Sequence, residues 1–271
     1  MLNEVRKIGV FIKRDFRVYF TYKLAVSMAF LSILFNFLYM VLFGSMFQAG
    51  VIPALDAYGG DFVSYILVGS VGWGLMWSVM SQTAESLRTE MELGTLESII
   101  MTPTSIYTMI IAYTLFGSVF GMISIVGLVL VGIGLFGINV FATASIFTLI
   151  IFILSLILMT GFGMILGGLT IWIKHIGQTA PLIQSVAMFF CGVYFPIAVL
   201  PESMQAMAKF VPFYWSIEGL RKSLIPGTQF SEMINITLIL IVLSIIFVII
   251  GAYALNRGLK KAKKDGSLSF Y

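Results

Sequence analysis

From Ser98 to Ile173 the chain contains no lysine, arginine, aspartate or glutamate. A charge-free stretch of this length is typical of helices in a lipid bilayer, where one span needs roughly 20 predominantly apolar residues. Across the 271 residues only 10% are charged, whereas soluble domains carry about 25%. The period-2 alternation of a transmembrane barrel is absent from the sequence. We therefore expect an all-α, polytopic membrane protein.

Six segments have the length and composition of a membrane span. They are Leu24–Phe47, Phe62–Met80, Ile106–Phe136, Phe141–Ile171, Pro181–Val199 and Met233–Leu255. The third and fourth are separated by a turn at Gly137-Ile138-Asn139. We expect one transmembrane domain over residues 1–271, in which residues 24–255 hold six spans and residues 256–271 form a basic tail.

The basic residues are concentrated near the two ends of the chain. Residues 1–23 and residues 256–271 together carry most of them, and six spans place both ends on the same side of the membrane. Because cytoplasmic loops are enriched in lysine and arginine, both termini are predicted to be cytoplasmic in a cell (plasma) membrane protein. This orientation leaves only Lys209, Arg221 and Lys222 of the 16 basic residues outside.

Residues 1–23 have the pattern of an amphipathic helix. The apolar positions, at spacings of three or four, are Val5, Ile8, Ile12, Phe16 and Tyr19, and another face carries Arg6, Lys13 and Arg17. Such a helix is suited to lie in the headgroup plane, in contact with membrane lipids. A simple basic anchor that only fixes the topology explains the same residues.

A polar segment, Glu85–Pro103, separates the second span from the third, and we call it the elbow. It holds four of the twelve acidic residues, Glu85, Glu90, Glu92 and Glu97. A segment this polar is costly to keep in hydrocarbon, so it is expected to project into water. Its charge pattern fits a docking surface for a soluble partner and an ordinary solvated loop equally well.

The stretch Val193–Gly227 is interrupted by four prolines yet is strongly apolar and aromatic. Prolines break long helices, and an ordinary exposed loop would be more polar. Short helices that dip back into the membrane fit this composition better than an external cap packed against itself, which is the alternative.

Several chemistries are not indicated by the sequence. There is no Gly-x-x-x-x-Gly-Lys-Ser/Thr phosphate loop, so the chain is not expected to hydrolyse ATP itself. The single histidine, His175, and the single cysteine, Cys191, do not make a metal or catalytic site, and the interleaved basic and aromatic residues of a nucleic-acid surface are absent. No charged residue lies mid-span, which argues against an ion-coupled carrier. The protein is thus predicted not to be an enzyme.

Together these features resemble the permease subunits of ABC exporters, in the type-2 ABC permease family. The elbow contains Glu-x-x-x-Gly-Thr-Leu-Glu followed by Thr-Pro, at Glu90–Pro103. Phe195-Pro196 through Leu200-Pro201, then Pro212 and Leu220-Arg221, resemble the family signature between spans five and six. With the basic N-terminal helix, the resemblance covers essentially the whole chain.

The resemblance implies that two six-span copies pair as a homodimer around a central pathway and that each docks a separate ATPase.

ATP and Mg²⁺ would bind to that ATPase, with no cofactor in this chain. A short coupling helix at Gly94–Met101 would seat in a groove of the ATPase, with Leu96, Ile99 and Ile100 filling the groove and Glu92 and Glu97 meeting basic residues. The implied coupling residues are Glu90, Glu92, Gly94, Thr95, Leu96, Glu97, Ile99, Ile100, Thr102 and Pro103. Thr102-Pro103 would start the third span.

The residues of the second motif are implied to form a re-entrant, extracellular gate. They are Phe195, Pro196, Leu200, Pro201, Pro212 and Arg221. The expected function is the membrane subunit of an exporter for a hydrophobic drug, a lipid or a lipid-linked glycan. An ion-coupled carrier or channel, and a membrane scaffold without transport, are the alternatives.

Overall fold

The computed structural model describes residues 2–24, 26–28, 31, 32, 34, 35, 38, 39, 42, 53–58, 62–137, 143–173, 179–225 and 228–265. Within these ranges the chain forms helices and turns, and no β-strand occurs. The first predicted span, Leu24–Phe47, falls largely outside the described residues.

The helices follow one another along the chain in a simple order. They are α1 (Leu2–Thr21), the 3₁₀ helix η1 (Pro53–Tyr58), α3 (Phe62–Glu92), α4 (Thr95–Ile100), α5 (Ile106–Phe136), α6 (Ile146–Ile173), α7 (Thr179–Phe190), the 3₁₀ helix η2 (Ile197–Val199), α8 (Glu202–Phe210), α9 (Pro212–Ser223) and α10 (Phe230–Lys264).

Four of these helices, α3, α5, α6 and α10, are long and apolar enough to cross a membrane. They correspond to the second, third, fourth and sixth predicted spans, and the third agrees with its prediction at both ends. Helices α3 and α10 continue well past the predicted ends, to Glu92 and Lys264. Polar residues extend these helices because, once a helix has started, each further residue adds a backbone hydrogen bond.

The fifth predicted span, Pro181–Val199, is not a single helix. Helix α7 has 12 residues, about 18 Å at 1.5 Å per residue, which is short of the roughly 30 Å hydrocarbon core. It ends at Phe190, and Gly192 follows with a φ of 64°, a left-handed conformation that favours glycine and turns the chain. Because the whole segment is apolar, its composition gave no sign of the turn at Gly192.

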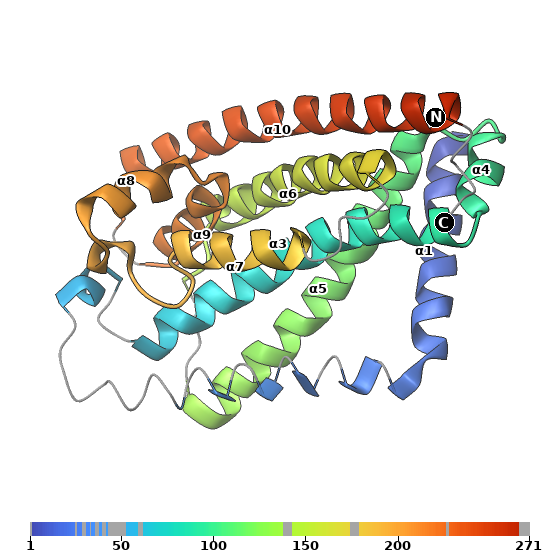
Figure 1. Ribbon diagram of the computed structural model, residues 1–271. Coiled ribbons are helices and arrows are strands. Elements are labelled where there is room, and N and C mark those ends of the chain that lie inside the picture. The colour runs from blue at the N-terminus through green and yellow to red at the C-terminus, as the bar shows by residue number, and fades with distance from the viewer. Residues whose placement is uncertain are drawn as a thin grey trace.

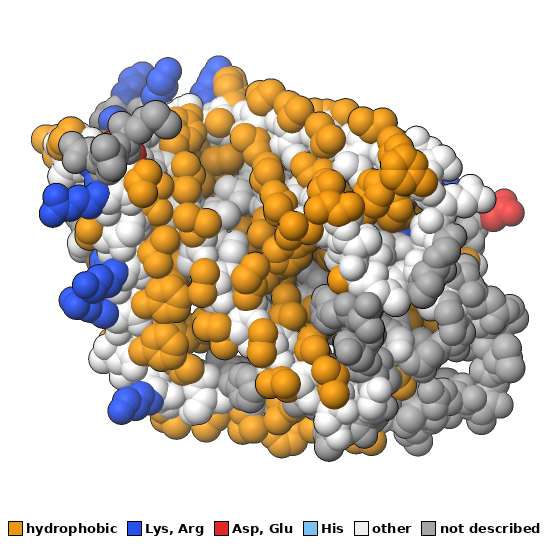
Figure 2. Space-filling view, turned by 180° about the vertical axis from the view of Figure 1, so that it is seen from behind, with side chains coloured by type: hydrophobic (Ala, Val, Ile, Leu, Met, Phe, Trp, Pro, Cys, Tyr) orange, Lys and Arg blue, Asp and Glu red, His pale blue; other side chains and the backbone are white. Residues whose placement is uncertain are grey.

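The long helices run alongside one another, and α1 lies across their ends (Figure 1). The elbow, the start of α1 and the end of α10 are found together at one end of the bundle, which we call the elbow end. The opposite end, formed by α8 and α9, is the cap end. Lysine and arginine side chains gather along the elbow edge of a broad apolar surface (Figure 2). In the described chain, α8 and α9 contribute the remaining three basic residues, Lys209, Arg221 and Lys222.

Helices α6 and α10 form the most extensive helix pair, and glycines allow their backbones to touch. A Cβ atom at Gly251 would lie 2.3 Å from the carbonyl oxygen of Gly161, and one at Gly258 would lie 2.5 Å from that of Gly168. The glycines are thus seven residues apart on both helices, two turns of each. Small residues at this spacing let helices pack closely in lipid, where dispersion contacts replace the hydrophobic effect.

The core has two parts along the bundle. At the cap end α3, α6, α7, α9 and α10 surround side chains such as Trp73, Phe213 and Leu240. At the elbow end Leu87, Leu96 and Leu255 belong to a second cluster, against which Phe11 of α1 packs. The elbow is therefore fastened to the bundle by its own apolar side chains.

Candidate functional site

The elbow has the form of a sharp helix–turn–helix. Gly94, with a φ of 67°, breaks the chain between α3 and α4, as its position in the sequence predicts. The observed helix, Thr95–Ile100, lies within the predicted Gly94–Met101. The third span does not begin at Thr102-Pro103. These residues form a turn, and Ser105 caps α5 by accepting a hydrogen bond from the Tyr107 amide at 3.3 Å.

The apolar face of α4 points inward. Leu96 is fully buried in the core cluster of the elbow end, and Ile99 and Ile100 pack against that cluster. Leu96 therefore does not fill a groove on another protein, because it holds α4 to its own bundle, whereas the predicted contact of the partly exposed Ile99 and Ile100 with a partner stays a prediction. A spacing of i, i+3 and i+4 shows that three residues share a face, but it does not say which neighbour the face meets.

Other residues form the outer surface of the elbow. Leu93 is 71% exposed and Met101 is 82% exposed, although both are apolar. Glu97 and Thr102 are also exposed. Glu92 is exposed as well, but it pairs with Arg88 on the same helix, with Nε and Oε1 2.8 Å apart. An outward surface of two large apolar side chains among polar ones is therefore available to a partner.

Glu90 is buried and connects four helices. Its carboxylate pairs with Arg14 of α1, with Nη1 and Oε1 2.6 Å apart, and accepts a hydrogen bond from the Tyr113 hydroxyl of α5 at 3.0 Å. The Thr95 hydroxyl at the start of α4 donates to the same carboxylate. The predicted coupling residue Glu90 thus does not face a partner; it joins α1, α3, α4 and α5. Thr95 is likewise bonded inside the elbow.

Asp15 completes this cluster from α1. Its carboxylate pairs with Arg14 at 2.8 Å, and its side chain is only 12% exposed. Burial raises the pKa of the Asp15 carboxyl above its ordinary value, while the hydrogen bond from Arg14 opposes that shift. The sequence analysis missed Arg14 and Asp15. The signal was available, since Asp15 stands three residues after Ile12, on the otherwise apolar stripe of the helix.

Helix α1 itself is confirmed, and its contacts with α5 are extensive. Phe16 packs edge-to-face on Phe116 at 4.9 Å between ring centroids, and Tyr19 packs on Phe120 at 4.6 Å. Val5, predicted on the apolar face, is instead 68% exposed. The helix is therefore more than a basic anchor: it is packed on a long helix of the bundle.

The first turns of α1 also bind the end of the elbow. The Lys7 ammonium donates to the carbonyl oxygen of Pro103 at 2.6 Å. Glu4 accepts from the Thr108 hydroxyl at 2.6 Å. Hydrogen bonds from Lys7 and Thr108 lower the pKa of the Glu4 carboxyl. The elbow is thus attached to α1 at Glu90 and at Pro103.

Between α1 and α3 lies a cavity of about 470 Å³ with mixed charge. Arg14, Asp15, Glu85 and Glu90 line it together with Tyr19. The cavity lies beside the ion-pair cluster and separates part of α1 from α3.

The predicted gate residues lie at the cap end, and Arg221 is the most firmly held. It is 4% exposed, its Nη2 donates to the carbonyl oxygen of Val193 at 2.8 Å, and its guanidinium stacks 3.6 Å from the ring centre of Tyr65 in α3. The Tyr65 hydroxyl donates to Gly192 at 2.8 Å. Nearby, Tyr58 donates to the buried Glu218. Arginine forms such combined stacking and hydrogen-bond contacts better than lysine.

The other gate residues shape the backbone around this cluster. Pro196 and Pro201 immediately precede η2 and α8, and Pro212 lies in the first turn of α9. Phe195 packs on Phe189 at 5.5 Å, and Leu200 is partly exposed. Most of α9 is buried against α3, α6 and α10, whereas α8 is mostly exposed.

Gly69→Val is expected to destabilise the cap end. A Cβ atom at Gly69 would lie 2.3 Å from Arg221 Nη2 and 2.3 Å from the Val193 carbonyl oxygen, so the guanidinium must leave its position. We expect a loss of about 3 kcal/mol, the upper range for overpacking, measured as reduced thermal stability in detergent. Gly74→Val on the same helix is the control, because no atom lies within 4 Å of its Cβ. Equal stability of the two variants would contradict the observed position of Arg221.

A protein-family model matches most of the chain. The model of the ABC-2 type transporter family matches residues 6–225, from α1 to the end of α9. The chain belongs to the ABC-2 transporter family. No curated protein matches the chain. The protein is therefore a multi-pass ABC transporter permease, and both the elbow and the Arg221 cluster lie within the matched part of this permease.

Proposed function

We propose that the chain is the membrane subunit of an ATP-driven exporter, moved by a separate ATPase that docks on the elbow. One observation carries the proposal: α4 is held rigidly to α1, α3 and α5 through buried Glu90, while Leu93, Glu97 and Met101 face outward. Because α4 is attached to three other helices, a movement of a protein bound to its exposed patch would be transmitted to the bundle. The permease family generally works with such an ATPase.

The distribution of charge supports a cytoplasmic elbow. Eleven of the 15 described lysine and arginine residues lie on the helices of the elbow end, α1, α3 and α10, and Lys23 follows α1. The start of α1 and the end of α10 lie at this same end (Figure 1). By the positive-inside rule this end faces the cytoplasm of a plasma membrane protein, with both termini inside. Six spans, of which α3, α5, α6 and α10 are four, give the same arrangement.

The remaining features of the proposal rest on the family. Two copies of the permease pair around the transport pathway, and ATP and Mg²⁺ bind to the ATPase subunits. The cargo we favour is a hydrophobic drug, a lipid or a lipid-linked glycan, in keeping with the apolar and aromatic side chains of the spans. The buried Arg221 cluster and α9 lie where the pathway would reach the outer surface.

Met101→Asp combined with Leu93→Asp tests the docking surface. We expect binding of the ATPase and ATP-driven transport to fall by about tenfold or more, since a loss of only 1.4 kcal/mol in docking is tenfold in affinity. The measurement is ATPase binding and transport in proteoliposomes containing the permease and its ATPase. Phe210→Asp is the matched control, because Phe210 is 88% exposed on α8 at the cap end.

Three results would overturn this function. One is wild-type binding and transport in the double variant of the elbow. Another is uphill transport that persists without the ATPase and stops when an ion gradient is removed, which would favour a carrier. The third is ATPase binding without any transport of cargo, which would indicate a scaffold.

A further inference from the structure

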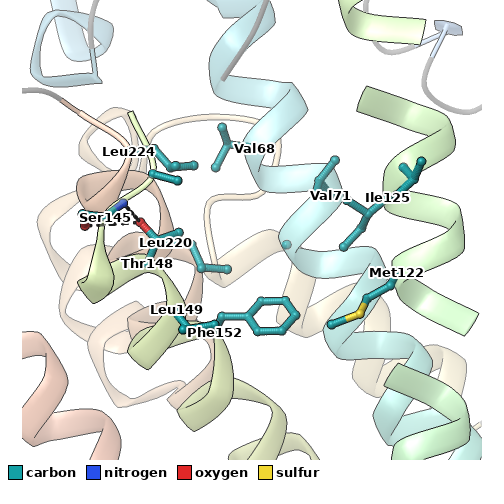
Figure 3. A pocket seen from close by; sticks show the side chains of 13 residues that line it. Val68, Val71, Met122, Ile125, Ser145, Thr148, Leu149, Phe152, Leu220 and Leu224 are labelled. Carbon is teal, nitrogen blue, oxygen red and sulfur yellow. Dashed lines mark hydrogen bonds between the residues drawn. The ribbon is translucent and has the colours of Figure 1, made fainter. Parts of the chain in front are cut away.

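A second cavity opens on the surface of the bundle, toward the cap end. Its volume is about 390 Å³, within the range of roughly 300–1,000 Å³ that is typical of ligand pockets. Helices α3, α5, α6 and α9 enclose it with side chains that include Val71, Met122, Phe152 and Leu220 (Figure 3). It is separate from the elbow and from the Arg221 hydrogen bonds.

The polar residues of the lining are all at one end. Ser145 precedes α6 and Thr148 is in its first turn, whereas Phe152 lies one turn deeper and Met122 lies on the facing α5 (Figure 3). The Thr148 hydroxyl already accepts from the Ser145 amide at 3.0 Å and donates to the carbonyl oxygen of Ser223 at 3.3 Å. The deeper walls offer only apolar surface, so the ligand they fit is a hydrocarbon.

The cavity borders surface that faces lipid. Met122, Val126 and Leu149 line it and are 44%, 57% and 54% exposed on apolar spanning helices. Water is a poor occupant, because apolar cavities stay dry. A protein segment would have to enter as a helix, which satisfies its own backbone N–H and C=O groups but is about 10–12 Å across, so one turn of it fills about as much space as this cavity of about 390 Å³. A lipid chain from the adjacent leaflet meets neither objection.

We propose that this cavity binds one acyl chain of a bilayer phospholipid from the leaflet at the cap end. The chain lies between α3, α5 and α6, with its headgroup beyond Ser145 and Thr148. Because Leu220 and Leu224 of α9 form one wall, the lipid packs directly beside the helix that carries Arg221. The bound lipid thereby supports the position of α9.

The test uses the full-length protein in nanodiscs of phosphatidylcholine that carries a photoreactive diazirine in one acyl chain. After irradiation, mass spectrometry of peptides locates the adducts, which we expect on Val71, Met122 or Phe152. Val126→Trp fills the cavity from α5 and is expected to reduce these adducts by about tenfold. Leu130→Trp is the matched control: Leu130 lies one turn further along α5, is 64% exposed, and does not line the cavity.

Ala144→Trp, at the rim of the cavity, is a second filling variant in case Val126→Trp does not fold. Three outcomes would overturn the proposal. They are unchanged labelling in the folded filling variant, equal loss in Leu130→Trp, and the absence of adducts on Val71, Met122 and Phe152 in the wild-type protein. The nanodiscs contain no cargo and no ATPase, so failure here leaves the exporter function standing.

Discussion

Glu90→Ala is expected to lower the free energy of unfolding by about 3 kcal/mol, near the low end for breaking a buried ion pair, because Arg14 is 40% exposed. Tyr113 and Thr95 lose their acceptor at the same time. If force enters through α4, ATP-driven transport should fall by more than the loss of folded protein explains. The measurements are thermal unfolding in detergent and transport in proteoliposomes, both normalised to folded protein.

A double-mutant cycle with Arg14→Ala separates the pair from its surroundings. We expect the summed loss of unfolding free energy in the two single variants to exceed the loss in the double variant, by a coupling energy of about 1–3 kcal/mol. The Arg88–Glu92 pair is the control, because it lies on the same helix but is exposed, and such i, i+4 pairs contribute about 0.2–0.5 kcal/mol. Strictly additive effects of Arg14→Ala and Glu90→Ala would count against the cluster.

Gly251→Val is expected to separate α6 from α10. Its Cβ would lie 2.3 Å from the carbonyl oxygen of Gly161, and backbone cannot move aside as a flexible side chain can. We expect a loss of about 3 kcal/mol or more, beyond ordinary overpacking, and a smaller loss for Gly251→Ala. The measurement is resistance to unfolding in detergent, compared with the wild-type protein.

Gly134→Val provides the control for this substitution. Gly134 also lies in an apolar spanning helix, α5, but nothing lies within 4 Å of the position of its Cβ. Valine there should change stability by less than 1 kcal/mol, the usual range for a position without close contacts. If both variants unfold alike, the close approach of α6 and α10 is wrong.

Much of the fold could be predicted because lipid imposes simple rules on sequence. A spanning helix must be long and apolar, so α3, α5, α6 and α10 stand out. Gly94, Gly137 and Gly192 each end a helix with a left-handed backbone, but only the first two were predicted as breaks from the sequence. Around Gly192 the residues on both sides are apolar, so the sequence predicted a span that continues past the end of α7.

The candidate site was harder to predict, because its residues come from distant parts of the chain. The elbow was recognised from four acids in one segment, yet the sequence does not show that Glu90 is buried against Arg14. Nor does it show that Leu96 faces inward while Leu93 and Met101 face outward. Such distinctions depend on which helix packs where, and that is decided by contacts between residues far apart in the sequence.

Helix α3 carries a polar anchor near each of its ends. Tyr65 holds Arg221 near one end, and Glu90 holds Arg14 near the other, about 38 Å away at 1.5 Å per residue. A helix that is attached near both ends cannot tilt at one membrane face without displacing its contacts at the other. Motion begun on one side of the bilayer would then arrive at the opposite side through one continuous backbone, with no chain of intermediate side chains needed to relay it.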